Sequence, residues 1–417
     1  MRLVWLIVAL VLACGLRPLQ AADERRLARA EYRDRMKAGW IGQMVGVGFG
    51  GPTEFRHQGT IIPEAELPQW EPAMVNQFDQ DDLYVEMTFL GTLERYGLSV
   101  SSRQAGIDFA NSRYPLWHAN KAGRDLLRRG IAPPDSGHPA LNDHADDIDY
   151  QIEADFSGLI APGLPNTAIS LGETFGRIMN AGDGLYGGQF VGAMYAEAFF
   201  ESNPEQIVRA GLSAIPPGSQ YHECISDVLT WYREQPEDWE ATWQRLQEKY
   251  HRNPDYRRFS CSRLDQPEFN IDAKLNGAYI VVGLLYGGSD PLRTITIATR
   301  CGQDSDCNPS NAAGILFTTI GFDRLPATFK SALDQTKRFH STPYNMPRLI
   351  EVCDQLAAQA VVQAGGRIER DAAGAEVFVI PVQTPRPSRL ESCWNPGPLA
   401  KSRYTEEERS QIESAEP

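Results

Sequence analysis

Long apolar segments are nearly absent from this chain of 417 residues. The run from Leu3 to Ala13 has 11 residues, and no later stretch approaches the roughly 20 apolar residues that a membrane-spanning helix needs. Basic runs are missing too, because Arg128-Arg129 and Arg257-Arg258 are isolated pairs and the net charge is −14. This acidic balance excludes nucleic acid as the natural partner.

Two kinds of fingerprint are also missing. No Gly-Lys-Ser/Thr loop occurs, so the glycine-dense stretch Met44 to Gly51 is not a nucleotide-binding loop, and we expect it to let the backbone pass close to a cleft. No Cys-x-x-Cys or Cys/His zinc spacing occurs among the seven cysteines. Cys301 and Cys307 either form a disulfide or leave Cys307 as a free thiol. The demanding geometry of so short a bridge favours the free thiol.

The N-terminus is typical of an exported protein. Met1-Arg2 and the apolar run suit a signal peptide over residues 1–21, cleaved after Ala21. Alternatively, Val11-Leu12-Ala13-Cys14 resembles a lipobox, with the lipid on Cys14. Both readings predict export, as a periplasmic protein or a membrane-anchored lipoprotein. Contact with the membrane is expected only through that lipid.

The stretch Gly302-Gln303-Asp304-Ser305-Asp306 places two carboxylates on a glycine-led turn. Pro309 to Phe317 follows and reads as a buried helix, because proline suits the first turn of a helix. Asp304 and Asp306 are therefore expected to point from a helix N-terminus into a cleft, where oxygen ligands suit a hard divalent cation. The alternative is that they only cap the helix.

A second acidic stretch, Asp79-Gln80-Asp81-Asp82, precedes another helix with an apolar face. Acids so close together repel one another unless a cation or water neutralises them. The two clusters are expected to face each other and hold one or two metal ions. Two independent, solvated helix caps are the alternative.

These motifs together resemble the ADP-ribosylglycohydrolase family, which includes the dinitrogenase reductase-activating glycohydrolase. The opening stretch Ala38 to Gly46 and the turn Gly51-Pro52-Thr53-Glu54 resemble the family's first helix and glycine-rich turn. Ala181-Gly182-Asp183-Gly184 resembles its central substrate-side segment, and Leu285 to Asp306 its closing signature. The likeness runs from about Tyr32 to Phe322.

The resemblance implies an all-α, orthogonal helical bundle with a central centre of one or two Mg²⁺ or Mn²⁺ ions, Ca²⁺ being the other choice. The implied metal ligands are Asp81, Asp82, Asp304 and Asp306, and the implied catalytic residues are Glu54, Asp82 and Asp304. Gly182, Asp183 and Gly184 are implied to bind substrate. Gln80, Leu83 and Cys307 depart from the family pattern, which has hydroxyl residues at these positions, and Cys307 offers a sulfur that magnesium binds poorly.

The stretch Asp146 to Asp155 predicts one helix with Asp147, Gln151 and Asp155 on a single face. The face is either solvated or lines the cleft, in which case Asp146, Asp147 or Asp149 contacts the metal or the sugar hydroxyls. Asn142 and His144 are candidates for the same wall.

The chain divides into a helical domain over 30–362, a C-terminal β-hairpin extension over 363–399 and a disordered tail over 400–417. Charged residues from Asp23 to Met36 predict a leading helix.

The expected function is that of a metal-dependent glycohydrolase. It would cleave an N- or O-glycosidic bond at the anomeric carbon of ADP-ribose or a ribose-like sugar. An extracytoplasmic nucleoside or pentoside hydrolase and a catalytically inactive, metal-bearing binding protein are the alternatives. The expected partner is a small-molecule or glycosidic substrate, and the sequence leaves the oligomeric state open.

Overall fold

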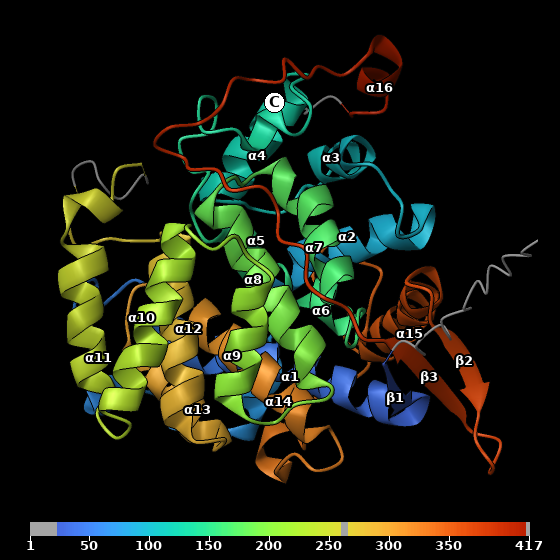
Figure 1. The fold of residues 1–417 in the computed structure, drawn as a ribbon, viewed down its shortest axis with the longest axis horizontal. Helices are drawn as coiled ribbons and strands as arrows, with labels where there is room; N and C mark the ends of the chain where they lie inside the picture. The colour runs from blue at the N-terminus through green and yellow to red at the C-terminus, as the bar shows by residue number, and fades with distance from the viewer. Residues whose placement is uncertain (1–22, 260–265, 414–417) are drawn as a thin grey trace, which may run out of the picture.

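The computed structural model describes residues 23–259 and 266–413. The segment predicted to be a signal peptide, including Cys14, lies outside the described residues. Helices make up most of the described chain, with one small antiparallel sheet at the edge of the helical body (Figure 1). The predicted all-α fold with a C-terminal hairpin is confirmed. Within these residues, no helix combines the length and apolar character needed to cross a bilayer.

Sixteen α-helices are defined within the described ranges, and several single 3₁₀ turns lie between them. In chain order the helices are α1 (Arg29–Gly50), α2 (Asp81–Tyr96), α3 (Ser102–Ala110), α4 (His118–Arg128), α5 (Asp149–Ile152), α6 (Asp155–Leu159), α7 (Pro165–Phe175), α8 (Asp183–Ala198), α9 (Pro204–Ser213), α10 (Gln220–Glu234), α11 (Trp239–Leu246), α12 (Ala273–Gly287), α13 (Pro291–Arg300), α14 (Cys307–Ile320), α15 (Met346–Gln363) and α16 (Glu406–Ser410).

Helices α1 and α14 pack against each other at the centre of the molecule because α1 carries a stripe of glycines. A Cβ on Gly46 would lie 2.3 Å from Ser310 N, and one on Gly50 would lie 2.0 Å from Ser305 O. Only glycine leaves room for backbone at that distance. The glycine-dense stretch is thus helical, and it brings the turn that carries Asp304 and Asp306 against the end of α1.

The sheet joins the two ends of the chain. Strand β1 (Glu24–Ala28) pairs antiparallel with β3 (Glu376–Pro381), which pairs antiparallel with β2 (Arg367–Arg370). The predicted hairpin is therefore present, but the predicted helix over Asp23 to Met36 is wrong in its first part. Backbone pairing with β3 overrides the weak local helical preference of a charged segment.

After β3 the chain runs back across the helices as an extended segment, residues 382–404, here called the C-terminal strap. Figure 1 shows it passing α7 and α8 and ending near α3 and α4, where α16 follows. Tyr404 is buried, and Arg103 forms an ion pair with Glu408. The prediction of a disordered tail over 400–417 is thus wrong for residues 400–413, because distant partners order them. Residues 414–417 lie outside the described part.

The single helix predicted over Asp146 to Asp155 is also wrong. The chain forms two short helices, α5 and α6, with a break at Glu153 and Ala154. The side chains of Asp147, Gln151 and Asp155 are fully buried, so the solvated-face alternative is excluded. Buried carboxylates need hydrogen-bond partners, and the partners here lie on different elements.

Candidate metal centre

The turn at residues 302–306 is held by the residues that alternate with its two aspartates. Gln303 Oε1 accepts from the Asn270 backbone N–H at 2.9 Å, and Gln303 Nε2 donates to Glu268 O at 2.7 Å. The Ser305 hydroxyl lies 2.9 Å from the Thr53 hydroxyl. Because these two side chains are anchored in protein, Asp304 and Asp306 are presented to the cleft.

The turn that carries Glu54 is joined to the same structure. Phe55 donates its backbone N–H to Gln303 O at 3.0 Å, and Gln303 donates to His57 O at 2.9 Å. Phe55 and Gln303 both have left-handed backbone conformations, with φ of 50° and 57°. Residues other than glycine rarely adopt this backbone conformation, and those that do are concentrated at functional sites. Glu54 therefore lies in a strained, double-anchored turn beside Asp304 and Asp306.

The third element is the N-terminus of α2, which begins at Asp81 after the N-cap residue Gln80. Asp81 and Gln80 line the cleft, whereas Asp82 is fully buried. Leu83 belongs to the apolar core. The departure from the family pattern at Leu83 is therefore outside the cleft, and the departure at Gln80 places an amide beside Asp81.

The two aspartate clusters meet at Cys307. Its sulfur and one carboxylate oxygen each from Asp81 and Asp82 lie within 4.8 Å of one another, and the same holds for Cys307 with Asp304 and Asp306. Both oxygens of Asp82 and Oδ1 of Asp304 are buried without a hydrogen-bond partner. Buried acceptors without partners are costly, and a cation satisfies them. The donor set fits a hard divalent cation at both aspartate pairs.

Burial and facing carboxylates shift the acidity of these groups. Burial, then the charges of Asp306 and Asp81, raises the pKa of Glu54 to about 8. Burial, then Asp306, raises the pKa of Asp81 to about 6. Burial and neighbouring carboxylates also raise the pKa values of Asp82 and Asp304 well above their usual range. Without a cation, the site therefore favours protonated acids.

Cys307 is a free thiol, as is Cys301, so the disulfide alternative is not formed. The Cys307 sulfur lies 3.8 Å from Asp306 Oδ1, and burial raises the pKa of the thiol. A protonated, soft sulfur therefore stands between the two aspartate pairs.

A second layer of buried acids supports the centre. Glu86, one turn after Asp82 on α2, accepts from the backbone N–H of Phe156 at 2.8 Å. Asp155 accepts from Asn311 Nδ2 on α14 at 2.8 Å. These bonds tie α2, α6 and α14 together, and they explain why the chain breaks between α5 and α6. Sequence reasoning missed Glu86 because no local signal marks it.

Asp81, Asp304, Asp306 and Cys307 of the centre line a cleft of about 460 Å³. The lining is mixed: acidic and amide side chains share it with aromatic rings and with Ile148 and Ile152 from the α5 region. Sequence reasoning missed the aromatic members Phe55, Tyr84 and Phe269, which come from separate segments without a common periodicity. The aromatic lining residues are Phe55, Tyr84, Trp117, His118 and Phe269.

Asp149 lines this cleft, as predicted for the acidic stretch. Its carboxylate accepts from the backbone N–H groups of Ala119 and Asn120 at 3.2 and 2.9 Å. Asp147 lies further back, with Oδ2 2.6 Å from His144 Nδ1. The predicted wall residues thus divide into one that reaches the cleft and others that support it.

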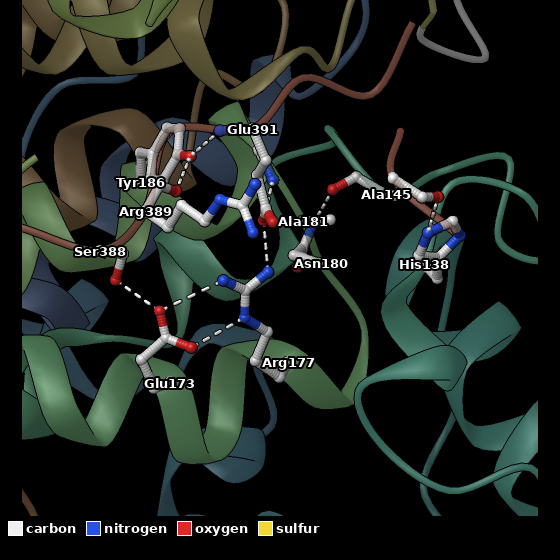
Figure 2. Close-up of polar contacts among 12 residues, drawn as sticks. His138, Ala145, Glu173, Arg177, Asn180, Ala181, Tyr186, Ser388, Arg389 and Glu391 are labelled. Carbon is white, nitrogen blue, oxygen red and sulfur yellow. Dashed lines mark hydrogen bonds and ion pairs between the residues drawn. The ribbon is translucent and has the colours of Figure 1, made fainter. Parts of the chain in front are cut away.

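Gly182, Asp183 and Gly184 are not among the described residues that line the cleft. Gly182 instead borders a separate cavity of about 840 Å³ beneath the C-terminal strap, and it donates its N–H to Glu391 Oε1 at 3.0 Å. Asp183 accepts from the backbone N–H of Tyr221 at 3.2 Å. Figure 2 shows Glu391 of the strap facing Arg177 and Tyr186 in this region.

Comparison with models of known protein families identifies the family of this chain. The family model described as ADP-ribosylglycohydrolase matches residues 28–364. Among solved structures, a chain titled "ADP-ribosylglycohydrolase-related protein complex" is 14% identical with a TM-score of 0.48, and the match covers 79% of this chain and 99% of that chain. A search of curated proteins found no match. The family model spans most of the chain, including both aspartate clusters and Glu54, so the chain belongs to the ADP-ribosylglycohydrolase family.

Proposed function

We propose that this protein is a metal-dependent glycohydrolase that cleaves an N- or O-glycosidic bond at the anomeric carbon of a ribose-like sugar. Family membership supports hydrolysis of a glycosidic bond in general. The observation that carries the metal dependence is the set of buried carboxylate oxygens of Asp82 and Asp304 that have no hydrogen-bond partner. They lie close to Asp81 and Asp306, which line a cleft large enough for a glycoside.

The four aspartates would hold one or two ions of Mg²⁺ or Mn²⁺, because these ions prefer carboxylate oxygens. When bound, such an ion supplies positive charge that orders sugar hydroxyls and increases the acidity of a coordinated water. Gln80 provides a further carbonyl group at the rim of the first pair. The Cys307 thiol is a weak partner for Mg²⁺ and favours the softer Mn²⁺.

Glu54 is the proposed proton-transfer residue. Its side chain is exposed and lines the cleft with Asp304 and Asp306, where a carboxyl group can give a proton to the leaving aglycone or take one from water. In the reaction, the bond from the anomeric carbon to the aglycone breaks, and its electron pair leaves with the aglycone, which gains a proton. A water oxygen forms the new bond to the anomeric carbon and loses a proton. Carboxylates around the sugar stabilise the positive charge that develops on the sugar in the transition state.

The experiment compares hydrolysis of a nitrophenyl riboside and of ADP-ribosylarginine by chelator-treated protein with and without added Mg²⁺ or Mn²⁺. Metal-dependent release of either aglycone supports the proposal. Glu54→Gln should lower kcat by at least 100-fold, in line with the loss of general acid–base catalysis, about 10²–10⁴-fold. Asp79→Asn is the matched control, because Asp79 also lies at the cleft but is mostly exposed. Metal binding without turnover of any riboside would show a binding protein instead.

A further inference from the structure

We propose that the substrate of this cleft is a phosphate-free glycoside whose aglycone is a flat, aromatic group. The inference rests on the proposed function for the position of the sugar, and it adds the substrate class. Three features of the described residues carry it: the sign of the charges in the cleft, the occupation of nearby helix N-termini by the protein's own carboxylates, and a row of aromatic rings.

Among the residues that the structure describes, the formal charges that line the cleft are all negative. Away from the four aspartates of the centre, the cleft adds Glu54, Asp79 and Asp149, and no lysine or arginine occurs among the described residues that line it. A diphosphate brings about two further negative charges, and like charges at close range disfavour binding unless cations or N–H donors offset them. One or two bound divalent ions would be largely neutralised by Glu54 and the four aspartates of the centre.

Backbone N–H groups at helix N-termini are the usual substitute for cations in phosphate binding. The N-terminus of α4 opens onto this cleft, but Asp149 already accepts from its Ala119 and Asn120 N–H groups. The N-terminus of α2 carries Asp81 and Asp82 themselves. A phosphate at either place would have to displace a carboxylate of the protein.

The N-terminus of α8 is closed in the same way. Gly182 donates its N–H to Glu391 of the C-terminal strap, and Asp183 forms the first residue of the helix. Figure 2 shows how the strap is fastened there, with Glu391 next to Arg177 and with Tyr186 hydrogen-bonded to the strap backbone. The glycine-rich segment that the family resemblance placed at the substrate is therefore covered by protein.

The aromatic row indicates what the cleft accepts instead. The Phe55 and Phe269 rings lie 5.4 Å apart, and His118 stacks on Phe269 at 5.9 Å. Burial lowers the pKa of His118 to about 4, so this ring is neutral. Trp117 stands at the rim with 53% of its surface exposed, which is unusual for so large an apolar side chain. These rings provide stacking faces for a planar aglycone, beyond the sugar bound at the metal centre.

The test measures binding separately from turnover. Glu54→Gln, used to suppress hydrolysis, is titrated calorimetrically at fixed free Mg²⁺ with a nitrophenyl riboside, with its 5′-phosphate and with ADP-ribose. We expect the neutral riboside to bind at least 10-fold more tightly than either phosphorylated ligand. Equal or tighter binding of a phosphorylated ligand overturns the inference, and so does the absence of riboside binding at millimolar concentration. If the wild type hydrolyses none of these ligands but the neutral riboside still binds most tightly, only the proposed function is refuted.

Two variants test the parts of the argument. Trp117→Ala should weaken binding of the nitrophenyl riboside at least 5-fold and change binding of methyl riboside by less than 2-fold, because only the nitrophenyl riboside has an aromatic ring to stack. Tyr96→Ala is the matched control, since Tyr96 is also an exposed aromatic residue but lies at the C-terminal end of α2. Asp149→Asn should reduce the difference in affinity between the neutral and the phosphorylated ligands. If Trp117→Ala affects the binding of both ribosides equally, the proposal of an aromatic aglycone is wrong.

Discussion

The hydroxyl groups of Thr53 and Ser305 lie 2.9 Å apart in a buried hydrogen bond. Thr53 precedes Glu54, and Ser305 stands between Asp304 and Asp306. This contact, with the Phe55 to Gln303 backbone bond, makes two turns far apart in the sequence into one rigid unit. The proposed acid/base residue therefore keeps a constant position relative to the second aspartate pair.

Metal ions should stabilise the folded protein. In chelator-treated protein, saturating Mg²⁺ or Mn²⁺ should raise the Tm by ~5 °C, because a ligand at 100 times its Kd stabilises the native state by about 2.7 kcal/mol. Asp82→Asn should abolish this shift, whereas Asp79→Asn should retain it. Scanning calorimetry of the three proteins measures it. An unchanged Tm at millimolar metal would contradict the assignment of the centre.

The metal-free protein should become less stable as pH rises from about 4.5 to 8. The folded-state pKa of Glu54 is raised from 4.5 to about 8 and that of Asp81 from 3.8 to about 6, so the folded state binds more protons than the unfolded chain in this window. The free energy of unfolding then falls with increasing pH, and the protonated acids stabilise the fold fully only at the acidic end. Urea denaturation in chelator at several pH values measures the slope.

Added Mg²⁺ should flatten that slope, because the cation takes the place of the protons. Glu54→Gln should make the dependence shallower between about pH 6 and 8, where the buried Asp82 and Asp304 still contribute. A free energy of unfolding that rises with pH across the window in the metal-free wild type would show that the acids are already neutralised by other groups.

Cys307→Ser should strengthen Mg²⁺ binding, because a hydroxyl oxygen is a harder ligand than a protonated thiol. We expect the Kd for Mg²⁺ to fall by about 3- to 10-fold and the preference for Cd²⁺ over Mg²⁺ to decline. Cys301→Ser is the control, since that thiol is buried but is not part of either cluster around the centre. Titration calorimetry with Mg²⁺ and Cd²⁺ measures both dissociation constants. Weaker Mg²⁺ binding by Cys307→Ser, with Cys301→Ser unchanged, would contradict this prediction.

Gly50→Ala should damage the centre from a distance. The new Cβ would lie 2.0 Å from Ser305 O and 2.5 Å from Asp306 Cα, so the turn must move. Overpacking of this kind costs about 1–3 kcal/mol, and displacement of Asp306 should weaken metal binding further. Gly51→Ala is a closely matched control, because nothing lies within 4 Å of its Cβ position and its φ is −50°. Comparable loss of metal affinity in both variants would refute the packing argument.

The signals that led from the sequence to a candidate metal centre are local. A glycine-led turn, alternating acids and a proline at a helix start all lie within the segment Gly302 to Pro309. The second pair at Asp81 and Asp82 begins α2 in the same way. What local signals could not show is that the chain breaks after α5, since the break depends on which distant side chains the fold brings near.

The errors have the same origin. A charged segment near Glu24 became a strand because β3 offered backbone partners, and the segment near Tyr404 became ordered because Arg103 and a pocket for its ring were available. The aromatic row could not be foreseen either, because Phe55 and Phe269 come from loops without periodicity. Their proximity follows from hydrogen bonds that join those loops to Gln303.

The pairing of β1 with β3 has a consequence for how the chain is made. Glu24 pairs with Pro381, so the first ordered segment to leave the ribosome waits for one of the last. At about 5–20 residues per second that delay is on the order of 20–70 s. The charges of Glu24, Arg25 and Arg26 protect the waiting strand from pairing with other chains, as charged edges generally do. A nascent chain that stops before β3 therefore leaves β1 without its partner.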